Sequence, residues 1–274
     1  MNDELTGRTL LMSGGSRGIG LAIAVAAGRR GANVVLMAKS DRPDPRLPGT
    51  VHTAADEIEA AGGTALAVVG DVRDDRDVEW AVSAAVARFG GIDVVVNNAS
   101  ALNLAGTEEL SAKRYDLLQQ VNSRGTFLLT RAALPHLRRS DRARVLTLSP
   151  PINLAPHWLG KFPAYMLSKY GMTLLTLGWA AEFADDGIAA NCLWPQTTIA
   201  TAAVVNLLGG DAAARRARSP QIMADAALAV LDLPAQRTGE TFIDVDVLAE
   251  TGRTDLAGYG GGDRLDYDFF VDVR

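Results

Sequence analysis

The chain has 274 residues, of which 48% are hydrophobic and 22% are charged, and its formal net charge is -5. This composition is typical of a globular protein with one sizeable core. The negative charge argues against a nucleic-acid surface, which needs a basic face, and the one basic run, residues 138–144, is interpreted as a solvated helix end.

The start of the chain and its cysteine usage indicate the compartment. Cys192 is the only cysteine, so an intrachain disulfide is excluded. Met1-Asn2-Asp3-Glu4 lacks the basic start and apolar core of a signal peptide. No apolar stretch approaches the ~18 residues of a membrane span. We therefore expect a cytoplasmic protein without a membrane span.

Apolar runs and helical periodicities alternate along the chain. The predicted strands cover residues 9–12, 33–38, 65–69, 92–96, 144–148, 188–193 and 241–245. The predicted helices cover residues 18–30, 53–61 (with Thr53 as cap), 74–89, 112–131, 164–184 and 222–231. Because the strands are continuously apolar, they predict a parallel sheet buried on both faces. The fold class is thus α/β, a single-domain doubly wound Rossmann-type sheet with helices on both faces, with a core over 5–247 and a tail over 248–274.

Two segments are irregular. Residues 40–52 contain Pro43, Pro45 and Pro48 and are predicted to form a long loop. The tail is glycine-rich after Gly252 and then carries three closely spaced aromatic residues, at positions 267, 269 and 270. A disordered tail is one interpretation, but the aromatic residues favour a docked one.

A glycine-rich turn follows the first predicted strand and opens the first helix. Glycines let the backbone approach a pyrophosphate closely, and the helix N-terminus offers free N–H groups to it. The strand-turn-helix context makes this a strong dinucleotide signal. The predicted cofactor contacts in this turn are Gly14, Ser16, Arg17, Gly18, Ile19 and Gly20.

The end of the second predicted strand indicates which dinucleotide binds. An acidic residue there accepts hydrogen bonds from the ribose hydroxyls of NAD, whereas the 2′-phosphate of NADP requires cations. The chain has Lys39 at this position and Arg17 in the glycine turn, and two cations can clamp a phosphate. Asp41 nearby is consistent with the other interpretation, in which both are ordinary surface charges. We predict NADP(H).

Tyr165 and Lys169 are four residues apart at the start of a predicted helix and share one face of it. A phenol has a pKa near ~10, and a neighbouring ammonium and an oxidised nicotinamide both lower it. Such a tyrosine can exchange a proton with a substrate oxygen while hydride moves to or from the cofactor. The pair is consistent with an oxidoreductase that acts on a small-molecule substrate, but this motif by itself is common by chance.

Four motifs in this order resemble the short-chain dehydrogenase/reductase family. They are the glycine turn, Asp71, Asn97-Asn98-Ala99 and the Tyr165/Lys169 pair, and the resemblance runs from about residue 5 to residue 247. It implies further site residues: Asp71 and Val72 at the adenine, Asn98 along the cofactor, Lys169 also at the nicotinamide ribose, Asn122 in a proton relay and the backbone of Thr198 at the carboxamide. A closer likeness is to a subfamily whose members carry an additional sterol-carrier domain, and we expect this protein to be without that domain.

The pattern departs from the family at one position. Most members carry a catalytic serine after the fifth strand, and counting from that strand places Pro150 in its slot. Ser149 is adjacent and is the predicted replacement, with Asn153 as the competing residue. Losing such a donor costs on the order of 10²–10³ in rate. Three functions remain open: carbonyl or alcohol oxidoreduction, reduction of an activated C=C bond in an acyl thioester, and an NADP(H)-binding sensor or scaffold with little turnover.

The helix that carries Tyr165 is apolar on nearly every side, whereas a surface helix shows one apolar stripe. No second domain is available to cover its outer face, so we expect a homo-oligomer, a tetramer or dimer, and the family resemblance agrees. The competing interpretation is a monomer in which the tail covers this face. His52, His136 and His157 do not have metal-ligand spacing, so no metal site is predicted.

Overall fold

The computed structural model describes residues 5–44, 47–202, 204, 210–262 and 264–272. Its centre is a seven-stranded parallel sheet in the order β3-β2-β1-β4-β5-β6-β7. The strands are β1 (Thr9–Ser13), β2 (Asn33–Ala38), β3 (Thr64–Val69), β4 (Val94–Asn97), β5 (Arg144–Leu148), β6 (Ala189–Trp194) and β7 (Thr241–Ile243). The predicted α/β fold class is confirmed.

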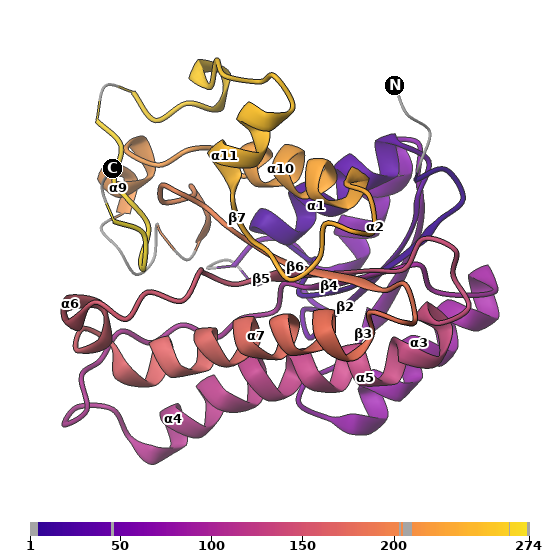
Figure 1. Ribbon diagram of the computed structural model, residues 1–274, viewed down its shortest axis with the longest axis horizontal. Helices are drawn as coiled ribbons and strands as arrows, with labels where there is room; N and C mark the ends of the chain where they lie inside the picture. Colours follow the sequence, from indigo (N-terminus) through magenta and orange to yellow (C-terminus); the bar gives the residue numbers. More distant parts are fainter. Residues whose placement is uncertain (1–4, 45–46, 203, 205–209, 263, 273–274) are drawn as a thin grey trace.

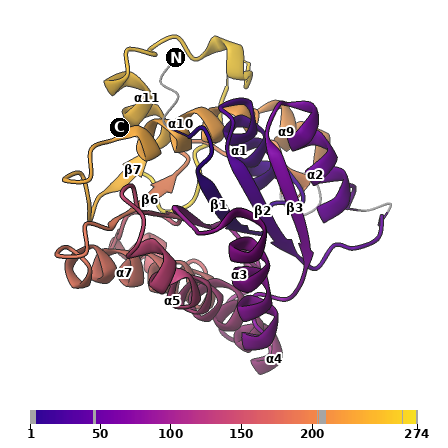
Figure 2. The same ribbon diagram turned by 90° about the vertical axis from the view of Figure 1, so that its right-hand side faces the viewer.

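Helices cover both faces of this sheet (Figure 1). One face carries α1 (Gly18–Arg29), α2 (Val51–Ala60), α10 (Gln221–Asp232) and α11 (Asp244–Glu250). The other carries α3 (Asp75–Phe89), α5 (Gly125–Leu137) and α7 (Pro163–Glu182). The remaining helices are α4 (Ala112–Gln119), α6 (Pro156–Leu159) and α9 (Gly210–Arg215). Figure 2 shows β1, β2 and β3 between α1 and α2 on one side and α3 on the other.

The strand order reverses between β1 and β4, because β2 and β3 lie on one side of β1 while the later strands lie on the other. In sheets of this kind, ligands bind outside the carboxyl ends of the strands at that reversal. The glycine turn follows β1 and Asn98 follows β4, so both lie at this position.

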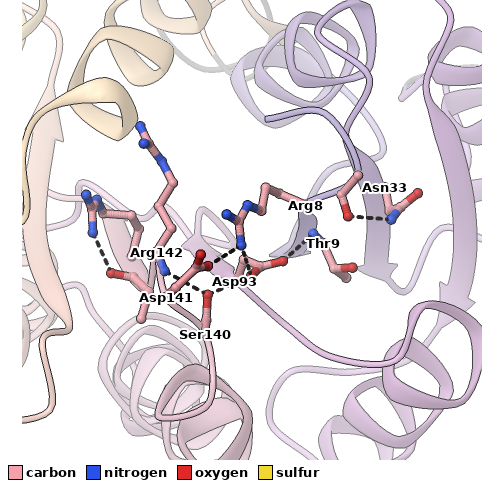
Figure 3. A network of polar contacts seen from close by, with 10 residues as sticks. Arg8, Thr9, Asn33, Asp93, Ser140, Asp141 and Arg142 are labelled. Atoms are coloured by element: carbon pink, nitrogen blue, oxygen red, sulfur yellow. Dashed lines mark hydrogen bonds and ion pairs between the residues drawn. The ribbon is translucent and has the colours of Figure 1, made fainter. Parts of the chain in front are cut away.

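A polar network fixes the opposite, amino-terminal ends of three strands (Figure 3). Asp93, just before β4, accepts hydrogen bonds from the Thr9 amide of β1 at 2.8 Å and from the Ser140 hydroxyl at 2.6 Å. Arg8 adds ion pairs to Asp93 and to Asp141, which precedes β5. These contacts hold the amino-terminal ends of the strands together, at the opposite end of the sheet from the glycine turn.

Four details differ from the sequence prediction. Thr50, not Thr53, caps α2, because the Thr50 hydroxyl accepts from the Thr53 amide while the Thr53 hydroxyl accepts from the Thr50 amide. The predicted helix 112–131 contains a π-helical turn at Gln120–Arg124 between α4 and α5. The last strand ends at Ile243, because Asp244 and Asp246 occupy the first turn of α11. The short helices α6 and α9 were not predicted.

No helix in the described ranges combines the length and the hydropathy needed to cross a bilayer.

Candidate active site

The glycine turn has the shape of a phosphate cradle. Gly14 and Gly18 have positive φ angles of 77° and 58°, which side chains rarely adopt. A Cβ at Gly14 would lie 2.8 Å from Cα of Ala99, and one at Gly20 would lie 2.5 Å from the side-chain nitrogen Nδ2 of Asn98. Arg17, at the N-cap of α1, makes no side-chain cap hydrogen bond, so the helix N-terminus keeps donors for an anion. These features fit the pyrophosphate of a dinucleotide. Ser16 is buried in the turn, and Ile19 packs on the core beneath it.

Asn98 braces this turn from the neighbouring strand. Its side-chain amide donates to the carbonyl oxygens of Gly14 at 2.8 Å and Ser13 at 3.3 Å. The Ser13 hydroxyl in return accepts from the backbone amides of Asn98 and Ala99. The structure therefore brings the predicted residues after β1 and β4 together.

The two predicted phosphate-binding cations lie at the end of β2. The Arg17 guanidinium donates to the Ser40 hydroxyl at 2.9 Å and to the Gly49 carbonyl at 2.7 Å, which anchors the proline-rich loop. The Lys39 side chain is 61% exposed, and its ammonium lies 3.6 Å from the Asp71 carboxylate. Arg17 donates to Ser40, and Lys39 precedes Ser40 in sequence. A phosphate bound beside Ser40 would therefore interact with two positive charges.

The Asp71 carboxylate forms ion pairs with two cations, Lys39 and Arg73. Burial opposes its ionisation, but hydrogen bonds from Arg73 and the charge of Lys39 lower the pKa of Asp71. Its carboxylate accepts from Arg73 at 2.6 Å. The neighbouring Val72 is mostly buried, against Gly125 at the start of α5.

Tyr165 and Lys169 lie on the first two turns of α7, and both are almost fully buried. The Lys169 ammonium donates to the Leu148 carbonyl at 2.6 Å and lies 4.9 Å from the centre of the Trp194 ring. Burial lowers the pKa of Lys169 to about 7, although Asp268 and Cys192 oppose this shift. Burial also raises the pKa of Tyr165 well above its ordinary value, and repulsion from Asp268 adds to it. In the protein alone, the Tyr165 phenol is therefore protonated at neutral pH.

Asn122 lies in the π-helical turn between α4 and α5 and is fully buried. Its side-chain oxygen accepts from the Ala101 amide at 2.7 Å. Its side-chain nitrogen donates to the Ala101 carbonyl and, at 2.8 Å, to the Ser168 hydroxyl. Asn122 thus ties the loop after β4 to the helix that carries Tyr165. π-helical turns of this kind are frequent at functional sites.

Among the described residues, neither predicted substitute for the missing serine forms a hydrogen bond with Tyr165. Ser149 is fully buried, and its hydroxyl lies near the Cys192 thiol but forms no hydrogen bond with any described residue. Asn153 donates instead to the Phe270 carbonyl and, at 2.8 Å, to the Asp272 carboxylate.

The end of the chain packs into this site. Tyr267 forms a bridge with Thr197 in the segment after β6, and the Asp268 amide donates to the Gln196 carbonyl at 3.0 Å. Trp194 donates from its indole nitrogen to the Phe269 carbonyl at 2.9 Å. Asp272 accepts from His157 and Trp158 of α6, at 3.1 and 2.8 Å.

Docking of this segment engages Thr198 as well. The Thr198 amide donates to the Asp266 carbonyl at 2.9 Å, and its carbonyl accepts from the Arg218 amide at 3.0 Å. The backbone that was predicted to meet a carboxamide is therefore already paired while the tail is docked. In the chain that follows Thr198, residues 203 and 205–209 lie outside the described residues.

Two phenylalanines of the tail form an aromatic wall around Tyr165. The Phe270 ring is stacked on Tyr165 with centroids 6.1 Å apart, and the Phe269 ring meets it edge-on at 6.5 Å. Phe269 also packs edge-on against Phe162 at 5.0 Å. A substrate that reaches Tyr165 would therefore meet an apolar, aromatic surface.

Sequence reasoning missed two polar residues of the site. Ser100 follows the Asn97-Asn98-Ala99 motif, and its polar interaction with Tyr165 opposes the rise in the tyrosine pKa. Asp268 interacts electrostatically with both Tyr165 and Lys169. The neighbouring aromatic residues signalled that the tail docks, but no pattern in the sequence indicated where.

Comparisons with known proteins agree with this geometry. Residues 8–208 match the family model described as short chain dehydrogenase. The chain is 48% identical over 271 residues to hydroxysteroid dehydrogenase-like protein 2 of Danio rerio, covering 98% of this chain but 65% of that protein. A crystal structure of a short chain dehydrogenase from Mycobacterium thermoresistibile is 54% identical, with a TM-score of 0.94 and coverage of 98% and 96% of the two chains. An NADH-dependent reductase in complex with NAD is 27% identical, with a TM-score of 0.73 and coverage of 89% and 97%.

Proposed function

The chain belongs to the short-chain dehydrogenase family, and on that premise we propose that it is an NADP(H)-dependent oxidoreductase acting on a carbonyl or alcohol. The observation that carries this proposal is the placement of Tyr165 and Lys169 together on α7, beside the carboxyl ends of β5 and β6. The bound cofactor would supply or accept the hydride. The glycine turn and Asn98 would hold it, with Lys169 at its ribose and Tyr165 passing a proton to or from the substrate oxygen.

The surroundings of Tyr165 favour an apolar substrate. The rings of Phe269 and Phe270 pack against the Tyr165 ring, Phe162 packs on Phe269, and Trp158 packs on Phe270 at 5.7 Å. An apolar surface of this kind favours binding of a hydroxysteroid or an acyl chain. It disfavours a sugar, because the hydroxyl groups of a sugar would be buried without hydrogen-bond partners. The name of the Danio rerio relative agrees with the first of these classes.

A turnover screen with NADPH tests the proposal. Ketosteroids and 3-oxoacyl thioesters probe carbonyl chemistry, and 2-enoyl thioesters probe C=C reduction. The second reaction is favoured by one observation: Pro150 has no donor and Ser149 faces Cys192, so neither orients a carbonyl. Consumption of NADPH with the carbonyl substrates is the expected result. NADPH binding without any turnover would instead favour a sensor or scaffold.

We expect NADPH to bind more tightly than NADH. Lys39→Ala and Arg17→Ala should each weaken NADPH binding by about 10- to 100-fold, the value of a charge-assisted hydrogen bond to phosphate. Binding of NADH, which lacks that phosphate, should change little. Fluorescence titration of both cofactors measures this difference.

Arg42→Ala is the matched control, because Arg42 belongs to the same loop but its side chain is 92% exposed and pairs with Asp41. Equal affinities of the parent protein for the two cofactors would refute the preference.

We also propose that the protein is a homo-oligomer. The docked tail packs on Tyr165 and Tyr170, whereas Leu167 and Leu174 of α7 stay 49% and 60% exposed, and Phe127 of α5 is 41% exposed. The tail thus leaves this apolar face of α7 open, which favours a second copy as its cover.

Leu174→Glu combined with Leu167→Glu should dissociate the assembly, because two carboxylates would be buried without partners. Light scattering should then give one chain mass, 28.9 kDa, in place of a multiple of it. Leu154→Glu, at a leucine that is 67% exposed in the loop before α6, should leave the assembly intact. A parent protein of one chain mass at micromolar concentration would contradict the oligomer.

A further inference from the structure

Trp194 contacts both Lys169 and the C-terminal segment 264–272, although the reaction proposed above gives it no role. It is the last residue of β6 and is 8% exposed. It belongs to a cluster of buried side chains that also contains Tyr165 and Phe270. The face and the edge of its indole group make different contacts, which point to two linked functions.

The face of the Trp194 ring contacts the Lys169 ammonium. The ammonium nitrogen lies 4.9 Å from the ring centre, within the ~6 Å of a cation–π interaction, for which tryptophan is the best ring. The same ammonium donates to the Leu148 carbonyl at 2.6 Å. Leu148 is the last residue of β5 and pairs in register with Leu193, which precedes Trp194. The carbonyl and the ring thus hold the ammonium across the carboxyl ends of β5 and β6.

The direction of the ring follows from the alternation of side chains along a strand. Ala190 and Trp194 are four residues apart in β6, so their side chains lie on the same face of the sheet. Ala190 packs in one core cluster with Trp179 and Ala180 of α7. Trp194 therefore also faces α7, the helix that carries Lys169.

The edge of the same indole group holds the C-terminal segment. Its Nε1–H group donates to the Phe269 carbonyl at 2.9 Å. The rings of Phe269 and Phe270 pack against the Tyr165 ring. One side chain thus contacts Lys169 with its face and, with its edge, the segment that packs on Tyr165.

We propose that Trp194 is a positioning residue, which holds the Lys169 ammonium with its ring face and the C-terminal segment with its N–H group. This role rests on the function proposed above, in which Lys169 and Tyr165 act together. Lys169 is 2% exposed, and burial disfavours its charged form. The negative face of an indole ring attracts the ammonium but cannot accept its proton, as a carboxylate partner could. Trp194 therefore keeps a charged Lys169 near Tyr165 and fixes the segment that packs on that tyrosine.

The groups around Lys169 give the direction of the pH dependence. Burial lowers the pKa of Lys169 to about 7, while Asp268 of the C-terminal segment and the Cys192 thiol of β6 oppose the shift. Tyr165, one helical turn earlier on α7, has a raised pKa and is uncharged in this pH range. The ammonium is thus present below about pH 7 and is lost as the pH rises. Because the Trp194 ring also stabilises the ammonium, its removal should move this loss to lower pH.

Trp194→Leu removes both contacts, whereas Trp194→Phe keeps a ring face and removes only the N–H group. In Trp194→Leu, the alkaline fall in the rate of reduction should move down by about one pH unit, which lowers the rate on that limb by about 10-fold. In Trp194→Phe, the pH profile should stay close to that of the parent protein. Trp179→Phe, at a tryptophan that is also buried but lies in another core cluster, is the matched control. A parent-like profile in Trp194→Leu, or an equal shift in both variants, would overturn the role of the ring face.

Hydrogen exchange over residues 264–272 tests the contact of the N–H group. Exchange of the amides in this segment should quicken by about 5- to 10-fold in both Trp194 variants, because both lose the hydrogen bond to the Phe269 carbonyl. It should not change in Trp179→Phe. Unchanged exchange in Trp194→Phe would overturn the role of the N–H group.

NMR of protein labelled at the lysine ε-carbons tests the ring contact without turnover. The Trp194 ring shields protons above its face, so the ε-methylene signal of Lys169 should lie upfield of the other lysine signals. Lys169→Met identifies this signal by its absence. A Lys169 signal at the ordinary position in the parent protein would overturn the contact, even where Trp194→Leu does not fold. A parent protein that consumes no NADPH with any substrate would contradict the proposed function, while the NMR signal and hydrogen exchange would still judge Trp194 separately.

Discussion

Tyr165→Phe is expected to lower turnover by on the order of 10³-fold, within the range that a general acid contributes. Burial and the Asp268 carboxylate hold the pKa of Tyr165 high, so the phenol is a proton donor at neutral pH. Phenylalanine keeps the ring that packs against Phe269 and Phe270 and removes only the oxygen. NADPH binding and thermal stability should therefore stay close to those of the parent protein.

Steady-state kinetics and cofactor titration together measure this effect. A loss of kcat with unchanged cofactor affinity indicates an interaction made in the transition state. Tyr259→Phe is the matched control: Tyr259 is also buried, but its hydroxyl donates to Asp225 at 2.6 Å on the α10 side of the sheet. Turnover that survives in Tyr165→Phe would place the chemistry at another residue.

Phe270→Ala is expected to release the C-terminal segment from the site. Phe270 is 1% exposed and lies between the rings of Trp158, Tyr165 and Tyr170 at 5.3–6.1 Å. Removing such a side chain costs about 3–5 kcal/mol when the cavity remains. The tail can undock, which removes the cavity. The loss of stability should therefore appear first as local opening of the tail and not as global unfolding.

The backbone of Phe270 supports this expectation. Its φ angle of 68° is the only positive value among the described non-glycine residues, and a bulky side chain there costs about 1–3 kcal/mol. The aromatic contacts and the hydrogen bond from Asn153 must outweigh that strain. Without the ring, the aromatic contacts no longer offset this strain, so release of the segment is favoured.

Hydrogen exchange over residues 264–272 measures the release, and exchange there should quicken strongly in Phe270→Ala. Phe270→Leu, which keeps most of the apolar volume, should show a much smaller change. Turnover should fall in parallel in the alanine variant, because Phe269 would no longer pack against Tyr165. Unchanged exchange in Phe270→Ala would mean that the hydrogen bonds of Asp272 and Trp194 suffice to hold the tail.

The repeating part of the fold was predictable from the sequence because its signals are local. Each buried strand is an apolar run, each helix has its own periodicity, and both recur often enough to predict a parallel sheet. The glycine turn was predictable for the same reason, since its steric requirement is met within eight residues. The cap of α2 was misplaced by three residues, because Thr50 and Thr53 are chemically equivalent as caps and only backbone geometry chooses between them.

Which side chains make up the site is decided by contacts between residues that are distant in sequence. The sequence by itself determined the sheet, the glycine turn after β1 and the Tyr165–Lys169 spacing on one helix face. Only the tertiary structure decided that the Ser149 hydroxyl lies near the Cys192 thiol, that Asn153 holds the tail and that Asp268 interacts electrostatically with Lys169. The physical reason is that side-chain direction after a strand and docking of a terminal segment depend on packing between residues up to 119 positions apart, which no local pattern encodes.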